Sequence, residues 1–174
     1  MANIVVYESK YGSTEKYAKW IGEELSCKVC RVSDVSIEEL ESYDNIIFGG
    51  WVRCGKLEGF KKIRDNIDKL KDKNFLIFAC GLAPTEDGSY KDFKEKNFKD
   101  LNNLLTFYLT GAFDFNRLTF VDKMMMRVFK VMLKRVKRKD SDESTKGMLK
   151  AYEEPVDFTD REKIKPIIEA VRNL

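Results

Sequence analysis

The segment "IVVYESKYGSTEKYAKWIGEEL", residues 4–25, contains an apolar run, a hydroxyl-rich stretch and a helical pattern in succession. Residues 4–7 are apolar, as in a strand that is buried on both faces. From residue 13 the periodicity becomes that of an amphipathic helix, with an apolar face made of Tyr17, Ala18, Ile21 and Leu25. A buried strand that leads directly into a helix predicts the first strand–helix unit of an α/β fold.

Four more strand-like runs follow, and helical patterns separate them. The runs are residues 29–32, 46–48, 75–79 and 104–109. Strands that alternate with helices favour a doubly wound parallel sheet with right-handed crossovers. Between the third and fourth runs we predict a helix over residues 57–70, whose apolar face consists of Leu57, Phe60, Ile63, Ile67 and Leu70.

Two helix starts have the pattern of a capping box, in which a Ser or Thr precedes a Glu by three residues. One is Ser36 with Glu39, and the other is Thr159 with Glu162, before the apolar stripe of the last helix. Pro166 lies inside that last helical pattern. We therefore expect it to kink or delay the helix.

The composition is that of a globular protein, with 43% hydrophobic and 35% charged residues among 174. This length, without a repeat or a low-complexity linker, predicts a single domain over residues 1–174. No apolar run approaches the ~20 residues that a membrane-spanning helix needs. The N-terminus also lacks the pattern of a secretory signal, so we expect a cytoplasmic protein.

The chain has no histidine and four cysteines. Without histidine, Ser-His-Asp and Cys-His catalysis and most zinc chemistry are excluded. We therefore predict no metal site, and we expect a cofactor to carry the reaction if the protein is an enzyme. Cys27 and Cys30 have the spacing C-x-x-C, but on a predicted strand they face opposite sides. We interpret them as ordinary strand cysteines rather than a redox or zinc pair.

The hydroxyl-rich stretch lies where ligands bind in a doubly wound fold, beyond the carboxyl end of a strand. The helix after it offers N–H groups and the positive end of its dipole to an anion. The candidate phosphate-binding residues are Ser9, Lys10, Tyr11, Gly12, Ser13 and Thr14. Neither G-x-x-x-x-G-K-[ST] nor G-x-G-x-x-G is present, which argues for a phosphate monoester rather than ATP or a dinucleotide. The alternative is a structural helix cap.

At these residues the sequence resembles the flavodoxins, whose loop for the phosphate of flavin mononucleotide (FMN) has the pattern S/T-x-x-x-x-T. The resemblance implies a flavodoxin-like five-stranded parallel sheet of order 2-1-3-4-5 with helices on both faces. It also implies that the loops after the third and fourth strands hold the flavin ring through backbone groups and an aromatic side chain. The cofactor-binding candidates there are Gly50, Trp51, Val52, Arg53, Cys54 and Gly55 in one loop and Cys80, Gly81, Leu82, Ala83 and Pro84 in the other.

Trp51 is the candidate for stacking on the flavin ring, and Tyr90 is the second candidate. Gly49 and Gly50 are expected to end the third strand just before it. Two alternatives stand beside this interpretation. Trp51 could belong to the core, and the two glycine-containing loops could be simple turns.

The segment "FVDKMMMRVFKVMLKRVKRKD", residues 120–140, is basic and amphipathic. Residues 117–139 carry nine Lys or Arg and one Asp, whereas the whole chain has a net charge of only +3. One interpretation is the ordinary fifth helix of the fold with a solvated basic face. The other is an interfacial helix at about residues 120–139 that lies on an anionic membrane surface. A nucleic-acid partner is not expected, because no accompanying motif is present.

This segment is similar to the Met-rich basic helix of the flavodoxin-type, quinone-linked protoporphyrinogen dehydrogenases, whereas electron-shuttling flavodoxins are usually acidic. Residues 48–56, "FGGWVRCGK", resemble the family pattern I-G-x-x-I-R-x-G-x. Gly111-Ala112-Phe113 before the basic helix and Phe158-Thr159-Asp160 before the last helix also match. Two features depart from the family: the aromatic usual at the position of Cys54 is missing, and the loop over residues 81–90 is shorter and more acidic.

The resemblance implies an FMN-dependent oxidoreductase of haem biosynthesis that passes electrons from a reduced tetrapyrrole to a membrane quinone, with the flavin and no side chain as the catalytic group. Arg53 and Lys56 are candidates for pairing with substrate propionates, because a guanidinium matches carboxylate geometry. The protein would then lie peripherally on the inner face of the cell membrane. The alternative is a non-enzymatic flavodoxin that carries electrons between redox partner proteins. The sequence leaves the oligomeric state open.

Overall fold

A computed structural model of the chain describes residues 1–82, 89–99, 101, 104–136 and 151–174. The chain forms two compact units, one made of Met1–Gly111 with Thr159–Leu174 and the other of Ala112–Phe158. We refer to them as unit 1 and unit 2 and describe each by itself. A compact unit need not fold by itself, so the single domain over residues 1–174 stays a prediction.

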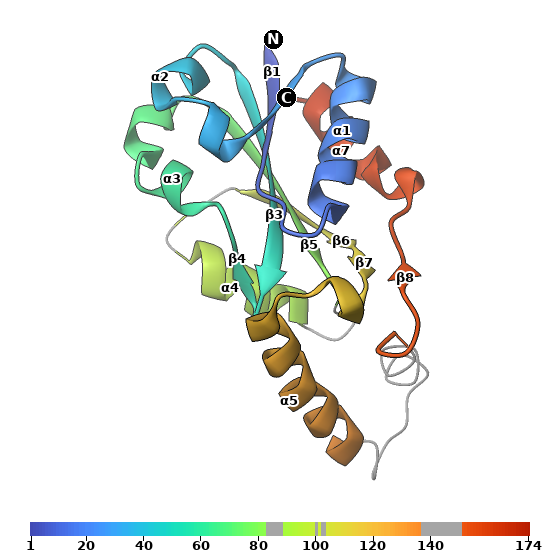
Figure 1. Ribbon diagram of the computed structural model, residues 1–174. Helices are drawn as coiled ribbons and strands as arrows, with labels where there is room; N and C mark the ends of the chain where they lie inside the picture. Colours follow the sequence, from blue (N-terminus) through green and yellow to red (C-terminus); the bar gives the residue numbers. More distant parts are fainter. Residues whose placement is uncertain (83–88, 100, 102–103, 137–150) are drawn as a thin grey trace. The chain divides into compact units, whose positions relative to one another are not determined.

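Unit 1 is built on one sheet, and its strands follow the predicted apolar runs (Figure 1). Five parallel strands lie in the order β2-β1-β3-β5-β6, which confirms the predicted flavodoxin-like fold and its order 2-1-3-4-5. These strands are β1 (Asn3–Tyr7), β2 (Lys28–Arg31), β3 (Asn45–Arg53), β5 (Asn74–Gly81) and β6 (Leu105–Thr110). The short strand β4 (Lys56–Leu57) pairs antiparallel with the end of β3.

Helices cover both faces of the sheet, as predicted (Figure 1). On one face lie α1 (Ser13–Leu25) and α7 (Lys165–Arg172). On the other lie α2 (Ile37–Leu40), α3 (Lys61–Arg64), α4 (Ser89–Phe98) and the 3-10 turns Val32–Asp34 and Ile67–Leu70.

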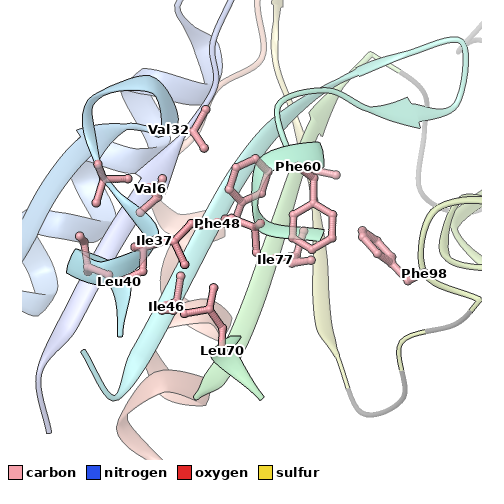
Figure 2. Close-up of a cluster of buried hydrophobic side chains, with 14 of the residues drawn as sticks. Val6, Val32, Ile37, Leu40, Ile46, Phe48, Phe60, Leu70, Ile77 and Phe98 are labelled. Atoms are coloured by element: carbon pink, nitrogen blue, oxygen red, sulfur yellow. The ribbon is translucent and has the colours of Figure 1, made fainter. Parts of the chain in front are cut away.

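Alternation along the strands divides the apolar side chains between two buried clusters. Val5 and Tyr7 belong to the cluster under α1 and α7, whereas Ile4 and Val6 belong to the opposite one. Figure 2 shows this second cluster, in which the Phe60 ring packs between other aromatic and aliphatic side chains. The central strands β1, β3 and β5 are therefore buried on both faces, which explains why they consist of apolar runs.

The continuous helix predicted over residues 57–70 is wrong. Leu57 belongs to β4, and Gly59 has a φ of +83°, a left-handed value that interrupts a helix. A Cβ at Gly59 would lie 2.3 Å from the Cβ of Glu8, so a larger residue would collide there. The apolar spacing reflects burial rather than one helix, because Phe60 and Ile63 are buried in and beside the short α3.

The Ser36 half of the predicted capping box is confirmed, whereas the Glu39 carboxylate pairs with the Lys28 ammonium. The Ser36 hydroxyl oxygen accepts a hydrogen bond from the Glu39 N–H at 3.1 Å, and α2 begins at the next residue, Ile37. The hydroxyl satisfies one of the backbone donors that a helix start leaves without an intrahelical partner.

The capping box predicted at Thr159 is wrong by one residue. Asp160 is the cap, and its carboxylate accepts a hydrogen bond from the Glu162 N–H at 2.9 Å. A 3-10 turn over Arg161–Ile164 follows, and α7 begins only at Lys165 with Pro166 in its first turn. The expected delay of the helix is confirmed, since proline fits the first turn, where its missing N–H has no intrahelical acceptor.

Tyr17 on α1 joins two segments that are far apart in the sequence. Its buried hydroxyl donates to the Thr110 carbonyl at 2.9 Å and accepts from the Asp160 N–H at 3.1 Å. The end of β6 and the start of the last helical segment are therefore held at one phenol oxygen.

The cysteines of the C-x-x-C spacing face opposite sides of the sheet, as predicted, although Cys27 lies one residue before β2. Cys27 packs against the cluster under α1 and α7, and Cys30 packs against the opposite cluster. Neither is in a disulfide, and burial raises the pKa of both thiols. A thiol with a raised pKa is a poor nucleophile and a poor metal ligand, which fits a structural role.

Unit 2 contains a small antiparallel ribbon and a long helix. The ribbon is β7 (Ala112–Phe113) with β8 (Val156–Asp157), followed after β7 by a 3-10 turn at Phe115–Arg117 and α5 (Phe120–Val136). The Tyr152 ring packs edge-on against Phe113, and its hydroxyl donates to the Met126 carbonyl of α5 at 2.9 Å. Burial raises the pKa of Tyr152 to about 12, so the phenol stays protonated and keeps this hydrogen bond.

The apolar residues on the solvent-facing side of α5 form a stripe. This exposed stripe consists of Phe120, Val121, Met124, Val128 and Val131, with Phe120 at 78% and Val128 at 61% exposure. Arg127 adjoins the stripe, and Lys123 and Lys130 follow around the helix. Among the residues that the structure describes, no helix is long and apolar enough to cross a bilayer.

Candidate functional site

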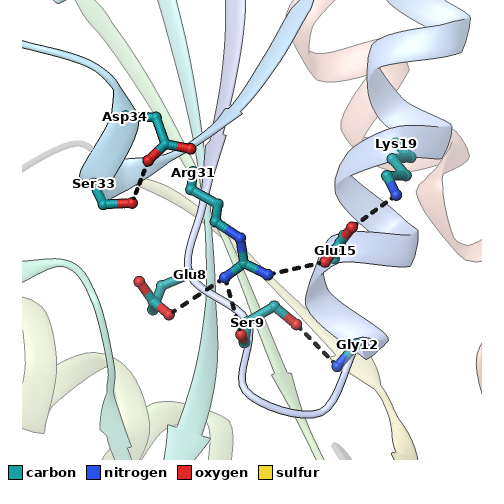
Figure 3. Close-up of polar contacts among 8 residues, drawn as sticks. All are labelled: Glu8, Ser9, Gly12, Glu15, Lys19, Arg31, Ser33 and Asp34. Atoms are coloured by element: carbon teal, nitrogen blue, oxygen red, sulfur yellow. Dashed lines mark hydrogen bonds and ion pairs between the residues drawn. The ribbon is translucent and has the colours of Figure 1, made fainter.

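The predicted phosphate loop joins β1 to α1 at the carboxyl edge of the sheet. Gly12 precedes α1 with a φ of +97°, and the Ser9 hydroxyl accepts its N–H at 3.1 Å (Figure 3). A Cβ at Gly12 would meet nothing within 4 Å, so there is open space beside the loop. Glycine is needed here because of the positive φ and not because of a close neighbour. As the N-cap, Gly12 gives α1 no side-chain cap. These features fit an anion at the helix start.

The hydroxyls of this loop are set at different depths. Ser9 is 7% exposed and Thr14 only 1%, so both are held within the fold, while Ser13 is partly buried at the start of α1. Lys10 and Tyr11 extend from the loop between them. The Lys10 ammonium lies 5.4 Å from the Tyr11 ring centroid and 5.3 Å from that of Trp51 on β3. The structure thus brings together the loop and the predicted stacking aromatic.

The prediction that Gly49 and Gly50 end the third strand is wrong. β3 continues to Arg53, because Gly50 and Trp51 pair with Ala79 and Cys80 of β5. The last residues of β3 then form an antiparallel hairpin with β4. Its turn is Cys54-Gly55, and both residues have positive φ values of 49° and 74°, as a two-residue type I′ turn requires.

Two residues of α4 that the sequence analysis did not single out fix this hairpin. The Asn97 side chain accepts from the Leu57 N–H and donates to the Gly55 carbonyl, both at 2.8 Å. The Lys96 ammonium donates to the Cys54 carbonyl at 2.7 Å. Asn97 is 8% exposed and lies beside the buried Phe98, so a polar residue on the apolar side of a helix was the signal that could have identified it.

The end of β5 lies against the start of α1 and the end of β6. A Cβ on Gly111 would lie 3.0 Å from the Cys80 sulfur and 3.2 Å from the Ser13 hydroxyl. A Cβ on Gly81 would lie 2.0 Å from the Tyr108 hydroxyl of β6. The predicted phosphate loop and the predicted ring-binding segments therefore converge at one edge of the sheet. Gly111 is a further residue of this edge.

The other predicted cofactor-binding residues are half-exposed or lie outside the described part of the chain. Val52 and Arg53 are half-exposed on β3, and Leu82 is half-exposed just after β5. Ala83 and Pro84 lie outside the described residues. Tyr90 belongs to α4, but its side chain lies outside the described part of the chain.

A model of the flavodoxin domain matches residues 4–142, most of the chain. The chain belongs to the flavodoxin domain family. Membership in this family supports FMN, the cofactor predicted from the sequence, and a flavin-dependent redox role. The open space at Gly12 and the convergence of three strand ends are features of this flavodoxin domain that fit a phosphate-bearing flavin.

Among known relatives, an uncharacterized protein of Methanocaldococcus jannaschii is 31% identical over 98 residues, which are 55% of this chain and 65% of that protein. The chain thus spans less than two thirds of that relative. A WrbA-like flavodoxin from Agrobacterium tumefaciens has 26% identity over 52% of this chain and 64% of its own, with a TM-score of 0.43. A flavodoxin from the domain Archaea has 19% identity over 72% and 90%, also with a TM-score of 0.43.

Proposed function

We propose that this flavodoxin domain protein is an FMN-dependent oxidoreductase of the protoporphyrinogen dehydrogenase type, which works at an anionic membrane surface. The bound flavin would supply the redox chemistry, and the chain would bind the flavin, the tetrapyrrole and the membrane. In each two-electron step, the tetrapyrrole is oxidised with loss of two protons, and one quinone takes up two electrons and two protons to become a quinol.

The exposed stripe on α5 is the observation that carries this proposal. Large apolar side chains on a globular protein rarely gather on one exposed face unless that face meets a membrane or a partner. The adjoining Lys123, Arg127 and Lys130 would attract anionic lipid headgroups. Within unit 1, α7 packs beside α1 on one face of the sheet and so takes the place of the last helix of the fold, which favours the interfacial interpretation of α5 over an ordinary fifth helix.

The β3–β4 hairpin supports a substrate with carboxylates. Arg53 and Lys56 are directly opposite in the hairpin register, so their side chains share one face. An anionic ligand with two carboxylates, such as the propionates of a tetrapyrrole, would match these two cations in charge.

Arg53→Ala is expected to raise the KM for protoporphyrinogen about 10- to 100-fold, because a charge-assisted hydrogen bond contributes about 1.5–3 kcal/mol. The FMN content of the purified protein should not change. The assay follows porphyrin fluorescence with a soluble quinone as acceptor. Arg172→Ala, at an exposed position on α7, is the matched control and should keep the KM of the original protein. An unchanged KM for Arg53→Ala would remove this residue from the substrate site.

Replacing two residues of the exposed stripe should weaken membrane binding. We expect the double variant Met124→Gln with Val128→Gln to bind vesicles of anionic phospholipid at least about tenfold more weakly, because both apolar side chains leave the acyl boundary. Binding of the original protein should weaken as salt is added. Leu105→Gln is the control, since Leu105 is an exposed apolar residue of unit 1. Equal vesicle binding by the double variant and the control would contradict the membrane role.

A non-enzymatic electron carrier is the second candidate, and membership in the flavodoxin domain family favours it. A carrier would bind FMN in the same site but would not turn over protoporphyrinogen and would need no lipid. Turnover with a quinone therefore separates the two functions. FMN binding without turnover and without vesicle binding would support the carrier.

A further inference from the structure

We propose that Arg31 is a positioning residue that makes the Ser9–Thr14 loop selective for the phosphate-bearing form of the flavin; this inference rests on the proposed FMN site. Arg31 is the last residue of β2, and it pairs in register with Tyr7 at the end of β1. Its guanidinium therefore lies beside the point where the loop leaves the sheet (Figure 3). One of its N–H groups donates to the Ser9 carbonyl at 3.4 Å.

Two carboxylates flank the loop, one at each end. Glu8 directly precedes Ser9, and Glu15 directly follows Thr14. Both carboxylates would repel a phosphate group bound in the loop, because like charges that lie close together repel each other even near the protein surface. Glu15 stays ionised, since a hydrogen bond from Lys19 lowers the pKa of its carboxyl group.

A single guanidinium spans both of these carboxylates. One terminal nitrogen of Arg31 lies 4.0 Å from a Glu8 oxygen, and the other lies 3.2 Å from a Glu15 oxygen (Figure 3). The planar cation also lies over the Tyr7 ring, 5.4 Å from its centroid, which limits its orientation. The forked shape matters, because a guanidinium offers donors on two separate terminal nitrogens, whereas a lysine carries all three of its donors on one nitrogen.

The arrangement suits a binding role better than a role in stability. The Arg31 side chain is 41% exposed, and ion pairs at this exposure contribute about 0–1 kcal/mol to folding. All three of its polar partners nevertheless belong to the predicted phosphate loop or to the residues at its two ends. Arg31 therefore holds the loop backbone at Ser9 and offsets the negative charge that the phosphate would meet.

The test compares two flavins that share a ring but differ in the phosphate. The Kd values of FMN and riboflavin are measured by quenching of flavin fluorescence for the original protein, Arg31→Ala and Arg31→Lys. We expect Arg31→Ala to weaken FMN binding about tenfold and to leave riboflavin binding unchanged, with Arg31→Lys between them. The triple variant Arg31→Ala, Glu8→Gln, Glu15→Gln should recover most of the FMN affinity, because the repelling carboxylates are gone.

The other outcomes overturn the inference in distinct ways. If both flavins weaken equally in Arg31→Ala, the residue is merely structural. If neither weakens, it has no part in binding. If the original protein binds neither flavin, the proposed function itself fails, and the role of Arg31 fails with it. Circular dichroism of each variant checks that a loss of affinity is not a loss of fold.

Discussion

Trp51→Ala is expected to weaken FMN binding about 10- to 100-fold. Stacking of a flat heterocycle on an aromatic side chain contributes about 1–3 kcal/mol when measured by substitution with alanine. Trp51 is half-exposed at the carboxyl edge of the sheet. Its ring already contacts the phosphate loop, because the ammonium group of Lys10 lies over it. The Kd would be measured by quenching of flavin fluorescence.

Riboflavin and a second tryptophan test whether the lost affinity comes from stacking of Trp51 on the flavin ring. Riboflavin binding should weaken by the same factor, because Trp51 acts on the ring rather than the phosphate, in contrast to Arg31. Trp51→Phe should keep most of the affinity. Trp20→Phe is the matched control, since Trp20 packs edge-on against Tyr17 on α1, within the cluster under α1 and α7. If Trp51→Ala leaves the FMN affinity unchanged, Trp51 does not stack on the flavin, and the alternative that it is a core residue is favoured.

Gly49→Ala is expected to lower the free energy of unfolding by about 3 kcal/mol. Gly49 and Phe78 are register partners on β3 and β5, and the Phe78 ring lies across the glycine. A Cβ there would lie 2.0 Å from the nearest ring atom. The ring has nowhere to move, because Phe78 is fully buried within the cluster under α1 and α7. Urea unfolding followed by tryptophan fluorescence would measure the change.

The compensating variant tests this explanation directly. Gly49→Ala combined with Phe78→Leu should be more stable than Gly49→Ala alone, because leucine leaves room for the new methyl group. The coupling between the two substitutions is then favourable, as expected for side chains in contact. A stability of Gly49→Ala within about 0.5 kcal/mol of the original would mean that the sheet relaxes around the extra carbon.

The strands and the first helix could be predicted because their signal is local. The central strands β1, β3 and β5 are buried on both faces, so burial alone makes them apolar, as in residues 46–48 and 76–79. The Ser36 cap is likewise a contact between residues three apart. The phosphate loop was recognisable for the same reason, since strand, loop and helix follow one another without a break.

The parts that were mispredicted depend on distant partners. β3 continues past Gly49 and Gly50 because β5 pairs with it as far as Cys80, the register partner of Trp51. The hairpin turn has a cysteine at positive φ where a sequence pattern would call for Asn or Gly. Asn97, which holds that turn, lies 40 residues from the backbone N–H that it accepts. Local propensity carries no information about such pairings.

The double hydrogen bond of Tyr17 has a consequence for the evolution of the chain. Thr110 and Asp160 meet at one phenol oxygen, so the chain departs from the sheet and returns to it at the same place. Everything between them, including α5, is topologically an insertion whose two ends are already adjacent. Recombination could lengthen, shorten or exchange such an insertion without disturbing the sheet, because domains tolerate changes where chain ends lie close together. The sheet edge with the predicted phosphate loop and the basic helix α5 could thus have been acquired separately.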